Sequence, residues 1–98
     1  MRDTFLHWLD KKAGEDSKIV LIVGDMGYGH VPFEKPYVVN AGITEQFFMG
    51  MAAGMAIEGM KPYVYSCIPF VCMRNYEQLR NDICYQNLNV KLIGVQGS

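Results

Sequence analysis

Five consecutive aliphatic residues, Ile19–Val23, constrain the fold of this chain more than any other stretch. They follow Lys18 directly and include no polar position, so the run lacks the alternation of a strand that faces water on one side. Such a run is typical of a central strand in a parallel sheet, where helices bury both faces. The sequence therefore predicts an α/β fold organised around this strand.

The other expected elements alternate with loops along the chain and complete this fold class. Strands are indicated by short β-branched or aromatic runs, and helices by apolar residues that recur every three or four positions. The expected order is helix, strand, strand, helix, strand, helix, strand, at residues 2–13, 18–23, 37–39, 44–58, 62–66, 73–86 and 90–95. This order predicts a parallel sheet with flanking helices.

The first expected helix has one apolar face. Phe5, Trp8, Leu9 and Ala13 are spaced so that they share one side of the helix, while charged residues occupy the other side. We expect this face to cover one side of the sheet.

Composition excludes several classes of function. The chain has 98 residues, half of them hydrophobic, and a net charge of −1, so we expect one small domain that gains stability from a partner. No basic run is present, which argues against nucleic acid or an anionic membrane surface as the main target. Three cysteines without a C-x-x-C spacing lead us to expect reduced thiols in a soluble, cytoplasmic protein.

A glycine-rich loop, residues 24–32, follows the expected central strand. Its glycines are spaced G-x-x-G-x-G instead of G-x-G-x-x-G, and it leads to Pro32 without opening a helix. A dinucleotide site is disfavoured here, because no helix N-terminus receives the phosphate. Asp25 is most simply a turn-forming residue in this loop.

Glu45 lies where an expected strand gives way to an expected helix. We expect Thr44, or a residue just before it, to cap that helix and Gly59 to end it. Ligands bind at the carboxyl ends of strands in open α/β sheets, so this position suits a catalytic acid. A first-turn glutamate can instead simply favour the positive end of the helix dipole. The junction alone leaves both roles open.

The residues around Glu45 resemble one known family. The motif Gly42-Ile43-Thr44-Glu45-Gln46, followed by small residues and methionines at 49–56, is similar to the pyrimidine-binding domain of transketolase-like thiamine diphosphate enzymes. The resemblance continues through residues 59–62, 74–82 and 89–92. It covers nearly the whole chain and implies that residues 1–98 are a single, truncated pyrimidine-binding domain, similar to the C-terminal subunit of split transketolases.

The resemblance implies that Glu45 is the catalytic carboxylate. In the family this glutamate hydrogen-bonds the aminopyrimidine ring of thiamine diphosphate and helps the coenzyme to form its attacking carbanion. We expect Ile43, Phe47 and Met49 to surround the carboxylate as an apolar shell. Gln46 is implied to orient the loop or a neighbouring subunit.

Further residues are implied to lie at the coenzyme. Phe70, in a loop expected over residues 67–72, would offer the aromatic face on which the pyrimidine stacks. Arg74 aligns with a family arginine that faces either the substrate or the structure. Asp25 and His30 belong to a loop that lies near the coenzyme and the other subunit in the family.

The diphosphate half of the coenzyme lacks a binding motif in this chain. In the family a G-D-G motif with a downstream asparagine, on a different domain, holds the diphosphate and Mg²⁺, and Gly24-Asp25-Met26 does not match it. We therefore expect no metal site here and a diphosphate-binding domain or subunit as the partner in a homo- or hetero-oligomer. Gly50 and Gly54 imply close packing, either on the sheet or at a subunit interface.

The leading interpretation is a transketolase-like transferase of carbohydrate metabolism, active only within a complex or larger subunit, that moves two-carbon ketol units between sugars. The beta subunit of a 2-oxoacid dehydrogenase and deoxyxylulose phosphate synthase use the same domain and stay open as alternatives. From another class, the chain can be a non-catalytic fragment or a dimer assembly module. The sequence names neither the sugars nor the partner chain.

Overall fold

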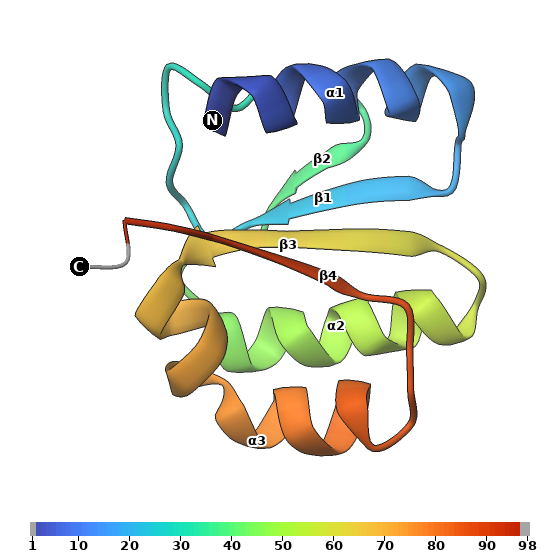
Figure 1. The fold of residues 1–98 in the computed structure, drawn as a ribbon, viewed down its shortest axis with the longest axis vertical. Coiled ribbons are helices and arrows are strands. Elements are labelled where there is room, and N and C mark those ends of the chain that lie inside the picture. Colours follow the sequence, from blue (N-terminus) through green and yellow to red (C-terminus); the bar gives the residue numbers. More distant parts are fainter. Residues whose placement is uncertain (1, 97–98) are drawn as a thin grey trace.

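The computed structural model describes residues 2–96 as one sheet with helices on both faces (Figure 1). Its elements are α1 (Arg2–Glu15), β1 (Ile19–Val23), β2 (Val38–Asn40), α2 (Glu45–Ile57), β3 (Lys61–Cys67), the π-helix η1 (Phe70–Arg74), α3 (Tyr76–Gln78), the π-helix η2 (Leu79–Cys84) and β4 (Lys91–Val95). The four strands lie in the order β2-β1-β3-β4, and all neighbouring pairs are parallel. The predicted parallel α/β fold is confirmed.

The strand β1 is buried along its whole length, as its apolar run predicts. Val20 and Ile22 belong to the core that packs against α2, whereas Leu21 and Val23 belong to the core that packs against α1. Figure 1 shows α1 on one side of the sheet and α2 with α3 on the other. One strand thus contributes to two cores, which explains why it has no polar position.

The helix α1 covers one face of the sheet, as predicted, but partly through other residues. Leu6 and Leu9 are buried, whereas Trp8 is 46% exposed. The Trp8 ring meets Tyr63 of β3 edge-on, with 6.3 Å between the ring centroids. The expectation that Trp8 lies on the inner face is therefore wrong, because the inner stripe passes through position 6 instead of position 8.

The segment after β3 also differs from prediction. The sequence predicts a loop at residues 67–72 and one helix at 73–86, but helical turns begin at Ile68 and are interrupted by a turn at Asn75. Much of the segment is π-helix, in which hydrogen bonds span one residue more than in an α-helix. A spacing of three or four in the sequence does not reveal this wider turn, so Phe70 lies in a helical turn and not in a loop.

The two ends of α2 differ in how well the sequence predicts them. Gly59 ends the helix as expected, with a φ of +90° and with N–H groups of Gly59 and Met60 bonded to carbonyls of the last turn. The expected side-chain cap by Thr44 is wrong. Its hydroxyl donates instead to the carbonyl of Ala41 at 2.9 Å.

The small residues of α2 lie on two sides of the helix. Ala52 and Ala53 are buried against the sheet, but a Cβ added at Gly54 would meet no atom within 4 Å, and one at Gly50 would make an ordinary contact. Packing within residues 2–96 therefore does not require these two glycines. None of the helices in this part of the chain is long and apolar enough to cross a membrane.

Two glycine substitutions should change stability in opposite directions. Gly54→Ala should raise the free energy of unfolding by about 0.5–1 kcal/mol, because alanine fits the exposed helix and loses less backbone entropy. Gly94→Ala should lower it by about 1–3 kcal/mol, because the new Cβ would collide with Cγ1 of Ile68 and lie 3.3 Å from its Cα. Urea unfolding of both variants tests this, and changes of the same sign would contradict the packing described.

Candidate active site

Parallel pairing brings short residues together at one edge of the sheet. Val23 of β1 is paired with Tyr65 of β3, so the next residues, Gly24 and Ser66, lie level with each other at the carboxyl ends of these strands. Glu45, the first residue of α2, packs against both: a Cβ added at Gly24 would lie 3.3 Å from Glu45 Oε2 and 3.4 Å from Ser66 Oγ. The predicted acid therefore lies at the edge where ligands bind in such sheets.

The carboxylate of Glu45 is inside the protein, with only 1% of the residue exposed. Its Oε2 accepts a hydrogen bond from the Ser66 hydroxyl at 3.1 Å, and its Oε1 accepts one from Arg74 Nη1 at 3.1 Å. An ionised carboxylate is unfavourable away from water unless it is paired and hydrogen-bonded. Glu45 meets both requirements, which a glutamate that only served the helix dipole would not need.

Arg74 links Glu45 to Phe70. Its guanidinium carbon lies 3.8 Å from the centroid of the Phe70 ring, while Nη1 bonds to Glu45. The Arg74 side chain is 44% exposed, so the guanidinium lies between a buried carboxylate and water. Three of the residues singled out in the sequence, Glu45, Phe70 and Arg74, are thus in one chain of contacts.

Sequence reasoning missed Gly24, Ser66 and Phe48. A Cβ at Gly24 would lie 3.2 Å from Phe48 Cε2 as well as close to Glu45, so the absence of a side chain lets the start of α2 approach the end of β1. The signal that was available is modest: a glycine after β1, and a serine near the end of β3. Neither position indicates by itself that it touches Glu45.

Asp25 belongs to a neighbouring polar cluster. Its carboxylate accepts hydrogen bonds from the Tyr28 hydroxyl and, at 3.1 Å, from the Asn40 amide. The Asn40 side-chain oxygen accepts bonds from the backbone N–H groups of Asp25 and Gly42 at 3.0 and 3.1 Å. The hydrogen bonds from Tyr28 first, and then from Asn40, lower the pKa of Asp25. The cluster ties the glycine-rich loop to the turn that precedes α2.

The expected apolar shell around Glu45 is not formed by Ile43 and Phe47. These side chains are 66% and 68% exposed, although Met49 is buried as expected. The helical repeat turns positions 43 and 47 outward when position 45 faces inward. Gln46 is exposed as well.

His30 is placed against α1. Its Nδ1 lies 3.0 Å from Asp3 Oδ1, and its Nε2 lies 2.9 Å from Arg2 Nη2. It therefore belongs to a surface cluster at the start of α1, and the contacts described for it do not bring it to Glu45.

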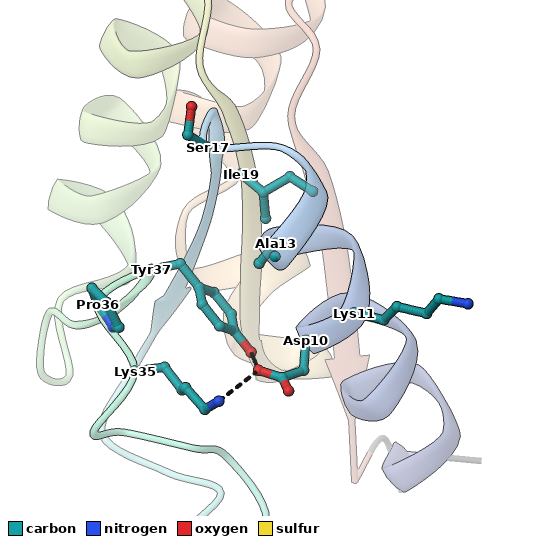
Figure 2. Close-up of a pocket in the computed structure, with 9 residues that line it drawn as sticks. Asp10, Lys11, Ala13, Ser17, Ile19, Lys35, Pro36 and Tyr37 are labelled. Atoms are coloured by element: carbon teal, nitrogen blue, oxygen red, sulfur yellow. Dashed lines mark hydrogen bonds and ion pairs between the residues drawn. The ribbon is translucent and has the colours of Figure 1, made fainter.

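A pocket of about 630 Å³ lies at the amino end of β1, the end remote from Gly24 (Figure 2). Ile19 lines it, and its polar groups are paired with one another. The Tyr37 hydroxyl donates to Asp10 at 2.9 Å, and Lys35 Nζ lies 3.7 Å from the same carboxylate. Burial and this hydrogen bond raise the pKa of Tyr37. The size of the pocket therefore does not make it the reactive site, because its groups are already satisfied.

The Glu45 cluster offers one carboxyl group in a fixed orientation. Ser66 holds one oxygen, while the other is directed toward Arg74 and Phe70. A carboxyl group placed in this way can exchange a proton with a ligand at the strand ends. In the part of the chain that the structure describes, no group of three or more histidine, cysteine, aspartate or glutamate side chains could hold a metal ion.

The sequence matches known proteins along its whole length. Residues 1–98 match the family described as transketolase, pyrimidine binding domain. One of the two subunits of the apulose-4-phosphate transketolase of Actinobacillus succinogenes is 43% identical over 67 residues, which are 65% of this chain and 22% of that protein. The 1-deoxy-D-xylulose-5-phosphate synthase of Acinetobacter baumannii is 39% identical over 93 residues, which are 90% of this chain and 14% of that protein.

The fold also matches a solved structure, described as a split gene transketolase, inactive beta4 tetramer. The TM-score is 0.84 at 34% sequence identity, and the match covers 95% of this chain and 32% of that one. The chain thus spans less than a third of the length of each of these three proteins.

The Asp25 cluster predicts a specific dependence of stability on pH. Because its hydrogen bonds lower the folded-state pKa of Asp25 below the ordinary value of 3.8, ionised Asp25 stabilises the fold above that pH. This contribution is lost as the pH falls through the lower, folded-state pKa. Between about pH 5 and about pH 2, the parent should therefore lose more stability than Asp25→Asn.

Urea unfolding at a series of pH values measures this difference. Glu34→Gln is the control, since it removes an exposed carboxylate from the same loop region but outside the cluster. If the curves of the parent and of Asp25→Asn are parallel, the ionised form of Asp25 does not stabilise this loop.

Proposed function

This chain belongs to the family of transketolase pyrimidine-binding domains, and on that basis we propose that it supplies the catalytic carboxylate of a thiamine diphosphate-dependent, transketolase-like transferase. The enzyme moves two-carbon ketol units between sugars. The observation that supports this most is Glu45, which is buried at the strand ends with one oxygen held by Ser66.

The residues present fit the aminopyrimidine end of the coenzyme. This ring needs a hydrogen-bonding partner at its edge and an apolar or aromatic surface at its face. Glu45 offers the first, and Phe70, which is half-buried beside it, offers the second. Arg74 borders the same place.

Three further residues complete the proposed coenzyme-binding surface. Ile43 and Gln46 flank Glu45 in the sequence and are exposed, and Asp25 follows Gly24, which packs against Glu45. Their contribution is contact at the rim of the site.

The proposed chemistry divides between the coenzyme and this chain. When bound, thiamine diphosphate supplies the carbanion that attacks a ketose. Glu45 would hold the pyrimidine by a hydrogen bond to its ring nitrogen and move a proton between its carboxyl group and that nitrogen. Ser66 keeps the carboxyl group in orientation, and burial keeps bulk water away from it.

The diphosphate and Mg²⁺ are proposed to be held by a different domain or subunit. Similar proteins include one named as a transketolase subunit and one described as a split gene transketolase tetramer. These names support an assembly of several chains. The partner proposed here is a diphosphate-binding domain or subunit that completes the site.

The exposed side of α2 is the surface proposed for this assembly. Ile43, Phe47 and Ile57 are each more than half exposed, and the space beside Gly54 is open. A contiguous apolar surface of this kind is unfavourable in water and marks an interaction site. The surface begins two residues before Glu45, so a partner that covers it also reaches the coenzyme site.

Deoxyxylulose phosphate synthase is the second candidate function. It is supported by 39% identity over 93 residues to the enzyme of Acinetobacter baumannii. The two functions use the same role for Glu45 and differ in the donor, so product analysis with a ketose donor or with pyruvate separates them.

Glu45→Gln should abolish most activity without unfolding the assembled enzyme. The amide fits the same space but cannot exchange the proton, so kcat should fall by about 10²–10⁴-fold, the usual contribution of a positioned acid or base. Steady-state ketol transfer and the amount of retained coenzyme are measured together. Glu77→Gln, an exposed glutamate of α3, is the matched control, and an active Glu45→Gln enzyme would exclude the catalytic role.

Phe47→Ser should weaken assembly. Removing a central aromatic residue from an interface typically costs more than about 1 kcal/mol, so the dissociation constant should rise roughly tenfold. Sedimentation velocity over a dilution series measures this. Trp8→Ser removes a half-exposed aromatic residue from α1 on the opposite side of the sheet, and an equal effect of both variants would argue against α2 as the interface.

A further inference from the structure

Arg74 contacts both of the groups that the proposed pyrimidine ring needs. Its Nη1 lies 3.1 Å from Glu45 Oε1, and its guanidinium carbon lies 3.8 Å above the centre of the Phe70 ring. The second distance is that of a full stacking contact, which leaves no space for another planar group on that face. The contacts of Arg74 and those proposed for the ring therefore exclude each other.

From this geometry we propose that Arg74 is an internal placeholder for the coenzyme. Its guanidinium holds the Glu45 carboxylate and covers Phe70 until the aminopyrimidine ring binds, and it then moves out into water. This inference rests on the proposed function, because it takes the pyrimidine site to be at Glu45 and Phe70.

The chemistry of a guanidinium suits this role. It is planar and delocalised, donates hydrogen bonds from its edge and stacks on aromatic faces. An aminopyrimidine has the same general features, namely a flat face and hydrogen-bonding groups at its edge. One pair of protein groups can therefore accept either partner in turn.

The burial of Glu45 explains why a placeholder is needed. A carboxylate that is 1% exposed would be strongly destabilising without a partner, and the Ser66 hydroxyl alone supplies no positive charge. Arg74 supplies it from the surface. Because its side chain is 44% exposed, the long stem can turn toward water without a change in the sheet or in α2.

The test is the rate at which thiamine diphosphate binds to the protein assembled with its diphosphate-binding domain or subunit. Arg74→Ala removes both contacts, so the association rate should rise about fivefold, in line with the modest strength of a partly exposed ion pair and cation–π contact. Arg74→Lys keeps a charge for Glu45 but cannot cover Phe70 with a planar cation, so its rate should lie between the two. Arg80→Ala, an exposed arginine of η2, should leave the rate unchanged.

A spectroscopic measurement follows the movement itself. In the coenzyme-free assembly, the Arg74 side-chain protons should show ring-current shifts and nuclear Overhauser contacts to Phe70. Both should disappear on addition of thiamine diphosphate. Arg74→Lys guards against loss of folding, since it retains a cation for the buried carboxylate.

The outcomes separate this inference from the proposed function. If the parent binds thiamine diphosphate and Glu45→Gln is inactive, but Arg74→Ala binds more slowly or equally fast, the function stands and the placeholder is wrong. The same holds if the Arg74 contacts to Phe70 persist in the coenzyme complex. If the assembled parent binds no thiamine diphosphate, the proposed function and the placeholder both fall.

Discussion

The structure depends on the burial of one carboxylate. Glu45 is the first residue of α2, and it can lie inside the protein only because the end of β1 is a glycine and the end of β3 presents a hydroxyl. A larger residue at position 24 would push α2 away from the sheet, and an apolar residue at position 66 would leave Oε2 without a donor. The parallel register brings Gly24 and Ser66 to the same level. The fold therefore prepares this site through backbone pairing before any side chain contributes chemistry.

The same helix has to satisfy two environments. Phe48, Ala52 and Ala53 bury one side of α2 against the sheet, while Ile43 and Phe47 remain in water on the other side. A helix that is apolar all round is typical of one that is buried all round. In residues 2–96 only one side of α2 is covered, so its composition is better explained by a partner on the exposed side than by the core alone.

The sequence predicts the elements of this site well and their contacts poorly. The apolar run of β1 indicates a buried parallel strand because burial on both faces leaves no position for a polar residue, and Gly59 marks the end of α2 because only glycine adopts its backbone conformation without strain. The contacts of Ser66 and Arg74 with Glu45 depend on strand register and on a π-helical turn. Neither leaves a periodic trace in the sequence. Trp8 was misplaced for a related reason, since large aromatic residues often lie at the margin of a core.

The Glu45 cluster also shows why cavity size is a poor guide to the site. The pocket of about 630 Å³ at the amino end of β1 is larger in extent but chemically complete, because Asp10, Lys35 and Tyr37 satisfy one another. The Glu45 cluster is small, and its only cation reaches it from a half-exposed side chain. A group that is satisfied by fixed neighbours has little to offer a ligand, whereas one satisfied by a movable neighbour can exchange that neighbour for a ligand at low free-energy cost. An enzyme that has to keep an acid buried and still present it to a coenzyme benefits from the second arrangement, and the exposed apolar side of α2 beside it provides the wall against which a partner can close the site.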